Sequence, residues 1–145
     1  MKNARKTVVF ALLVCVLAAV GCKKEKLTPT EMLTAGTCWQ VILLEGYEPG
    51  AELWVSVPVE DCLADNCFSF QADQSFKVDE GAAKCDANDP QSSVGAWSIS
   101  EDGKKLALTD DTEVTIGDVV ELTKEKLVYE TTLDEAKVRV TMSAK

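Results

Sequence analysis

The chain has 145 residues and a formal net charge of −9, from 15 basic and 24 acidic residues. An acidic surface repels phosphate backbones, so nucleic acid is excluded as a main partner. The chain also has no histidine, which excludes nucleophile pairs that need an imidazole base, such as Ser–His and Cys–His.

The first 21 residues have the pattern of a signal peptide. A basic start with Lys2, Arg5 and Lys6 precedes an unbroken apolar run over residues 8–20. A membrane-spanning helix needs about 20 apolar residues. The run is shorter, so we expect residues 1–21 to be a cleaved signal peptide.

The end of this run, "AAVGC", resembles the lipobox of bacterial lipoproteins. Small Ala19 and Gly21 stand three positions and one position before Cys22. The resemblance implies that Cys22 becomes the first residue of the mature chain and carries three acyl chains, such as palmitate. Three chains hold a protein firmly on a bilayer, since each buried CH₂ contributes about 0.8 kcal/mol. The alternative is an ordinary secretory signal followed by a cysteine.

Lipid attachment would place the protein in the bacterial cell envelope, with the membrane as a partner. Cleavage after residue 21 would move the formal charge from −9 to −12, because it removes three basic residues and no acidic ones. Residues 22–32 then read as a lipidated tether and the start of a helix. Lys23 stands where an aspartate retains some lipoproteins at the inner membrane. The resemblance therefore implies the outer membrane and leaves the leaflet open.

A short helix is expected at the start of the folded part. Thr28 and Glu31 fit a capping box, Pro29 fits the first helical position, and Gly36 fits the stop. This pattern predicts a helix of about two turns.

After Gly36, apolar residues alternate with polar ones in short segments, as in β-strands. Pro58 confines the segment 53–59 to a sheet edge or a loop. Short turn segments separate the strands, so we expect successive strands to pair as antiparallel neighbours. The alternating apolar residues are Trp39/Val41/Leu43, Leu53/Val55/Val57, Phe68/Phe70, Phe76/Val78, Trp97/Ile99, Leu106/Leu108, Val114/Ile116, Val120/Leu122, Leu127/Tyr129 and Val138/Val140/Met142.

Eight to ten short strands in a meander need closure to hide their edges. The sequence therefore predicts one all-β domain over residues 33–145, an antiparallel up-and-down meander that closes into a small barrel. A two-sheet β-sandwich is the alternative. Strands of about 5–7 residues would each send about three side chains inward, and large apolar side chains would then fill the interior.

The stretch "FSFQADQSFKV" predicts a β-hairpin with its tip at Asp73–Gln74. Residues that face each other across a hairpin have position numbers with a nearly constant sum. Phe70 pairs with Phe76 on this rule, and Cys62 and Cys85 then stand almost opposite each other. We therefore expect a Cys62–Cys85 disulfide, because the two Cα atoms would lie within bonding range.

Two further cysteines remain in the folded part, and cysteines in an oxidising compartment form disulfides. Cys15 lies in the signal peptide, so Cys38 and Cys67 are left to pair by elimination, and two buried free thiols are the alternative. Zinc is not expected, because the C-x₄-C spacing of Cys62 and Cys67 has no second close pair and no histidine beside it.

The central part of the chain contains an Asp–Cys pair at Asp61–Cys62, then "DEGA-x-KCD-x-x-DPQ" over residues 79–91, then "G-x-W" at residues 95–97. With this signature it resembles the lipocalin-like domain of small bacterial lipoproteins of Bacteroidota-type envelopes. That resemblance implies a lipocalin-like barrel, suggests carriage of a small ligand, and independently implies the Cys62–Cys85 pair. Two departures stand out: Gln74 replaces a glycine at the hairpin tip, and Cys38 and Cys67 lie outside the pattern. The matching residues are Asp61–Cys62, Asp65–Asn66, Phe68, Phe70, Asp79–Ala82, Lys84–Asp86, Asp89–Gln91, Gly95, Trp97 and Asp102–Lys104.

The sequence predicts no catalytic residue, no cofactor and no metal. The carboxylate pairs adjoin turns, where acidic residues are solvated. The segment "CDANDPQ" offers oxygen donors at Asp86, Asn88 and Asp89, but Pro90 and Gln91 break the calcium-loop pattern. A looser oxygen site stays open as an alternative, and we expect a stapled connection between two strands.

Four aromatic residues are candidates for lining a ligand pocket: Trp39, Phe68, Phe70 and Trp97. Core packing is the other explanation for such rings in a small barrel. We expect a membrane-anchored, non-enzymatic envelope protein that acts as an interaction or structural module, with another envelope protein as partner. The alternative is a carrier of a small hydrophobic ligand.

Overall fold

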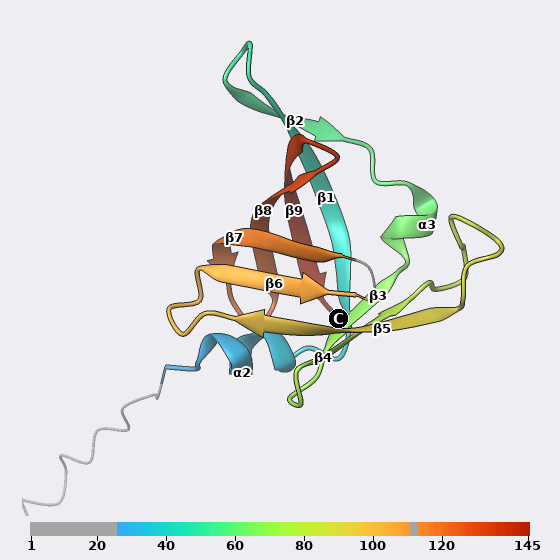
Figure 1. Cartoon of the computed structure of the whole chain (residues 1–145), viewed down its shortest axis with the longest axis vertical. Coiled ribbons are helices and arrows are strands. Elements are labelled where there is room, and N and C mark those ends of the chain that lie inside the picture. Colours follow the sequence, from blue (N-terminus) through green and yellow to red (C-terminus); the bar gives the residue numbers. More distant parts are fainter. Residues whose placement is uncertain (1–25, 111–112) are drawn as a thin grey trace, which may run out of the picture.

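The computed structural model describes residues 26–110 and 113–145, and the expected signal peptide and Cys22 lie outside this part. Eight antiparallel strands close into a barrel and a ninth lies outside it, which confirms the predicted all-β barrel (Figure 1). In chain order the elements are α2 (Pro29–Thr34), β1 (Trp39–Glu48), β2 (Leu53–Val57), α3 (Asp61–Ala64), β3 (Cys67–Phe70), β4 (Ser75–Asp79), β5 (Ser92–Ile99), β6 (Lys105–Thr109), β7 (Val114–Leu122), β8 (Lys126–Leu133) and β9 (Ala136–Ala144).

Strand β1 closes the barrel and also carries β2 away from it. It pairs with β9 along most of its length, with β3 only at Trp39–Phe68, and with β2 from Leu44 to Glu48. The expectation that successive strands are neighbours is therefore wrong for β2 and β3. The reason is the length of β1, whose ten residues exceed the 5–7 expected, so that its far half projects with β2 as a hairpin above the barrel (Figure 1).

The predicted capping box forms at the start of α2. The backbone N–H of Thr28 donates to Glu31 Oε2 at 2.7 Å, and the N–H of Glu31 donates to Thr28 Oγ1 at 3.2 Å. The six-residue helix buries Leu33 completely. The helix lies against one end of the barrel (Figure 1). Its Leu33 is part of the hydrophobic core.

The core fills the barrel with apolar side chains from α2 and from six of its strands. Trp39 and Leu127 have no exposed surface, and Trp97 is 4% exposed. The cluster comprises Leu33, Trp39, Val41, Phe70, Trp97, Leu106, Leu127, Val140 and Met142.

The sequence predicted the wrong set of inward-facing residues for β7. Val114, Ile116 and Val120 are 56%, 61% and 58% exposed, although their alternation suggested inward side chains. Gly117 pairs with buried Leu106 and therefore faces the interior. Because neighbouring residues of a strand face opposite sides, the even-numbered apolar residues face outward. A bulge between Val119 and Glu121 then shifts the phase, so that Leu122 packs against the core.

Candidate functional site

The four candidate aromatic residues lie together in the barrel interior. The ring centroid of Phe70 is 6.4 Å from that of Trp39 and 5.4 Å from that of Trp97, both in edge-on contacts. Phe68 is connected to this cluster through Phe76, and the ring centroids of Phe68 and Phe76 are 6.1 Å apart. Sequence reasoning thus identified residues that do meet, from β1, β3 and β5.

The indole groups of this cluster are bonded to the protein itself. Trp39 Nε1 donates to the carbonyl oxygen of Leu33 at 3.0 Å, and Trp97 Nε1 donates to that of Gln71 at 3.0 Å. Buried indoles need such partners. Because both N–H groups are already satisfied by backbone, neither points a free donor toward a ligand.

Two hollows on the surface of the described part of the chain are of ligand size, and neither is lined by these four aromatic residues. One, of about 350 Å³, lies where the start of β7 separates from β8; its lining includes Glu113, Asp118, Glu130 and Glu135. The other, of about 320 Å³, lies between α2 and β7. Ligand pockets are mostly apolar clefts, whereas the first hollow is bordered by carboxylates.

The Cys62–Cys85 disulfide confirms the predicted pair, with the two Cα atoms 5.1 Å apart. The route to it differs from the hairpin extension that we expected. The β3–β4 ladder ends at Cys67–Asp79, and Cys62 lies on the short helix α3. The disulfide therefore ties this helix to the 80–91 connection instead of joining two strands.

Hydrogen bonds from the signature residues hold the same connection in place. Asp65 Oδ2 accepts from the N–H groups of Ala82 and Ala83 at 2.8 and 3.1 Å. Gly81 has φ of 64°, and a Cβ there would lie 2.7 Å from atoms of Asp65. Only glycine fits this left-handed position beside the carboxylate.

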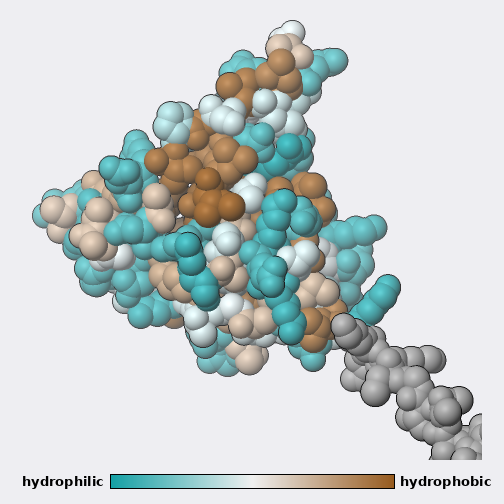
Figure 2. All heavy atoms as spheres, turned by 180° about the vertical axis from the view of Figure 1, so that it is seen from behind, coloured by the Kyte–Doolittle hydropathy of each residue, from teal (hydrophilic) through white to brown (hydrophobic). Residues whose placement is uncertain are grey.

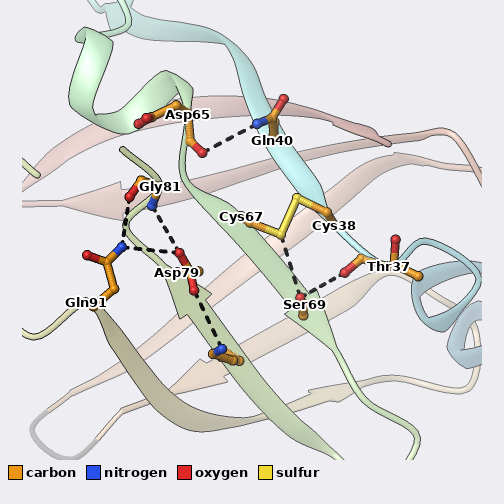
Figure 3. Close-up of a disulfide and its surroundings, with 10 residues drawn as sticks. Thr37, Cys38, Gln40, Asp65, Cys67, Ser69, Asp79, Gly81 and Gln91 are labelled. Carbon is orange, nitrogen blue, oxygen red and sulfur yellow. Dashed lines mark hydrogen bonds and ion pairs between the residues drawn. A yellow bond between two sulfur atoms is a disulfide. The ribbon is translucent and has the colours of Figure 1, made fainter. Parts of the chain in front are cut away.

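Asp79 and Gln91 hold the two ends of the connection together, where it leaves β4 and enters β5. Asp79 Oδ1 accepts from the N–H of Gly81 at 3.2 Å, and Gln91 Nε2 donates to the carbonyl of Gly81 at 2.8 Å (Figure 3). The hydrogen bond from Gly81 and that from Gln91 lower the pKa of Asp79. We call Asp65, Asp79, Gly81, Gln91 and the Cys62–Cys85 disulfide the loop clamp.

Buried Asn66 adds hydrogen bonds between α3 and the start of the 80–91 connection. With its amide oriented to satisfy its neighbours, Asn66 Nδ2 donates to the carbonyl oxygens of Cys62 at 2.9 Å and Glu80 at 3.0 Å. The signature "DCLADNC…DEGAAKCD…DPQ" is therefore explained by structure: its polar residues position a loop. This agrees with the expected stapled connection.

The second predicted disulfide, Cys38–Cys67, is also present, with Cα atoms 5.2 Å apart. It lies beside the weakest seam of the barrel, where β1 and β3 share a single ladder pair. Ser69 Oγ adds a hydrogen bond to the carbonyl of Thr37 at 2.9 Å (Figure 3). The disulfide thus replaces missing ladder contacts at this seam.

One group of three possible metal ligands occurs among the described residues: Glu60, Cys62 and Cys85. Both sulfurs belong to the disulfide. Only the exposed carboxylate of Glu60 is left to bind an ion, and one carboxylate does not make a metal site.

Sequence reasoning missed a charged and aromatic cluster on the outer face of β1, β2, β8 and β9. The Arg139 guanidinium lies 4.1 Å from the ring centroid of Trp54, and its Nη2 is 2.7 Å from Glu130 Oε1. Lys137 Nζ bonds the other oxygen of Glu130 at 2.9 Å. The signal was present as alternation of Lys137 and Arg139 on one strand, but their partners come from strands distant in sequence.

The carboxylate of Glu130 is only 18% exposed. Burial raises its pKa, but hydrogen bonds from Arg139 and Lys137 and their positive charges together outweigh burial, so the pKa lies below its usual 4.5. Glu130 is therefore ionised at neutral pH and serves as the acceptor that orders two cations.

The predictions of a signal peptide over residues 1–21 and of lipidation at Cys22 concern residues outside the described part. No helix in the described segments is long and apolar enough to cross a membrane.

Comparison with known families matches residues 34–129 to a lipocalin-like domain. The match covers more than half of the chain, from the end of α2 into β8, and includes the aromatic cluster and the loop clamp. Comparison with curated proteins gives no match. The closed barrel and the family match agree, and the chain belongs to the family of lipocalin-like domains.

Proposed function

We propose that this protein is a lipid-anchored component of the bacterial cell envelope, held at the outer membrane through Cys22, and that its barrel acts as a non-enzymatic interaction module. The signal-peptide pattern and the "AAVGC" sequence support the anchor. The absence of histidine from the sequence leaves no imidazole base for a nucleophile pair, which supports a role without that kind of catalysis.

The observation that carries the interaction role is the filled interior. Trp39, Phe70 and Trp97 pack against one another in the barrel and are at most 4% exposed. A small barrel of eight strands has just enough room for its own side chains or for one small ligand. With the interior occupied by the protein, its surface is left to contact other molecules.

The anchor is tested by labelling cells that produce the full chain with radioactive palmitate. We expect the wild-type chain to take up label and to need detergent for extraction from membranes, and Cys22→Ala to do neither. Cys15→Ala is the matched control, because it removes a cysteine from the expected signal peptide and leaves lipidation intact. Label retained by Cys22→Ala, or a wild-type chain extracted without detergent, would contradict the anchor.

The carrier alternative is tested separately by native mass spectrometry of the wild-type chain purified from its own envelope. An interaction module gives the mass of the acylated chain alone, less the four hydrogens lost in two disulfides. A reproducible additional mass of a small apolar compound would favour the carrier.

A further inference from the structure

Strand β2 has one edge without a partner. It pairs with β1 through Leu44–Val57 to Glu48–Leu53, and in the described part of the chain no other strand pairs with it. Its N–H and C=O groups on the far side are available to another strand. Pro58 follows the last residue of β2 and sets the length of this free edge at five residues.

The two faces of β2 differ. On one face Trp54 packs on Tyr47, with 5.2 Å between ring centroids, and Lys137 and Arg139 lie over its ring. That face is closed by the protein's own side chains. On the other face Leu53, Val55 and Val57 are 46%, 44% and 46% exposed.

At the centre of the open face no cross-strand side chain covers Val55. Val55 lies opposite Gly46, which has no side chain, and the nearest atom to a Cβ placed at Gly46 would be Val57 Cγ2, 3.7 Å away. Cross-strand side chains normally cover such a position. The side chain of Val55 is therefore accessible to a partner. Figure 2 shows apolar surface below the tip of the hairpin.

Natural proteins protect exposed sheet edges, most often with lysine or another charge inside the edge strand. The sequence of β2, LWVSV, has no charge. An apolar edge strand without an internal charge is open to pairing with another strand.

The charges around the edge indicate what covers it. Exposed Glu48 and Glu52 lie at the tip end of β2, and exposed Glu60 and Asp61 follow its other end. No lysine or arginine occurs in the sequence between Lys26 and Lys77, and the two cations that lie over Trp54, Lys137 and Arg139, are paired with Glu130. A second copy of this chain would bring like charges together at both ends, whereas a segment with basic ends would be attracted.

We propose that the free edge of β2 binds an extended segment of a partner protein by strand addition, and that this segment has alternating apolar residues flanked by lysine or arginine. Backbone hydrogen bonds to the edge supply affinity, and the apolar face with its acidic ends selects the sequence. The proposal rests on the interaction role proposed above and names its surface. In Figure 1 α2, the first described element, lies at the opposite end of the molecule from the hairpin tip. A chain anchored before α2 would therefore present this edge away from the membrane.

The test uses the full chain in mild detergent and a fluorescent peptide of sequence Lys-Lys-Val-Thr-Val-Thr-Val-Lys-Lys. We expect the peptide to bind, and binding to slow hydrogen exchange at residues 53–57 and not in β5 or β7. Two control peptides, one with Glu for every Lys and one with Pro for the central Val, should bind about tenfold more weakly or worse, because each removes one of the two interactions.

Two matched variants locate the site. Val55→Lys should weaken binding by about tenfold or more through charge repulsion and lost apolar contact. Val94→Lys, which adds the same charge at a 62% exposed valine of β5, should change binding less than about twofold. Exchange in the wild-type chain reports the site even if Val55→Lys fails to fold.

Three results would overturn the proposal: no binding of the basic peptide, protection at another strand, or equal binding of the proline peptide. Protection of residues 53–57 in the protein without peptide, together with a dimer in solution, would assign the edge to a second copy instead. None of these results affects palmitate labelling at Cys22, so failure of this proposal is distinguishable from failure of the anchor.

Discussion

The indole N–H of Trp39 donates to the backbone carbonyl of Leu33 at 3.0 Å, and both residues are completely buried. The bond joins the first helix to the first strand at the end of the barrel. The turn between them passes close to the indole, since a Cβ at Gly36 would lie 3.1 Å from Trp39 Nε1. Helix α2 is therefore an integral part of the core.

Replacement of Leu33 by alanine should destabilise the fold strongly. The side chain has no exposed surface, and its loss leaves a cavity against Trp39, so we expect the free energy of unfolding to fall by about 2–5 kcal/mol. Chemical denaturation measures this. Leu27→Ala, at a 36% exposed leucine just before the helix, is the control and should have a much smaller effect. Equal effects would mean that α2 is not part of the core.

Removal of the Asp65 carboxylate should loosen the loop clamp. Asp65→Ala leaves the N–H groups of Ala82 and Ala83 without their acceptor, and we expect a loss of about 1–3 kcal/mol in unfolding free energy. Hydrogen exchange at these two amides should quicken. Asp86→Ala, which removes a local bond to the N–H of Asn88, should leave them unchanged. Unaltered exchange in Asp65→Ala would contradict the clamp.

Gln74→Gly should stabilise the protein. Gln74 has φ of 68° at the tip of the β3–β4 hairpin, a conformation that costs a side-chain-bearing residue about 1 kcal/mol and costs glycine little. We expect a gain of about 0.5–1 kcal/mol, measured by thermal or chemical unfolding. Gln71→Gly in the same turn lies outside the left-handed region and should destabilise, so a gain from both changes would contradict the strain at Gln74.

The β3–β4 hairpin shows why part of this fold could be predicted from sequence. Phe70 and Phe76 face each other as their spacing requires, and Thr28 with Glu31 caps the helix as predicted. These features depend on neighbours along the chain. The Cys62–Cys85 pair was also predicted correctly, although α3 intervenes, because any short connection keeps the two cysteines at the same end of the hairpin.

Features that depend on distant strands could not be predicted. Ile116 was expected inside, but the pairing of β6 with β7 turned it outward, and only the register between two strands decides this. Pro58 predicted correctly that β2 is an edge strand, but its position outside the barrel depended on the length of β1. The cluster of Glu130 and Arg139 with Trp54 needed the pairing of four strands, β2, β1, β9 and β8, and local alternation does not show which strands pair.

The stability of the protein should depend on the ionisation of Glu130. Its pKa in the folded protein lies below 4.5, so the carboxylate binds its proton less readily in the folded chain than in the unfolded one. Its contribution is therefore complete above about pH 4.5 and is lost as the pH falls through the lowered pKa. Glu130→Gln removes the charge that orders Arg139 and Lys137, and we expect it to lower the unfolding free energy by about 1–2 kcal/mol at neutral pH.

The matched control is Glu121→Gln, which breaks an exposed ion pair with Lys126 and should cost less than about 0.5 kcal/mol at any pH. Melting temperatures of the three proteins measured at about pH 7 and about pH 3 separate the two sites. The gap between wild type and Glu130→Gln should narrow at the lower pH, because the wild-type carboxylate is then becoming protonated. A gap that stays constant would mean that the glutamate acts through packing alone, and the cation cluster would then owe its order to the stacking of Arg139 on Trp54.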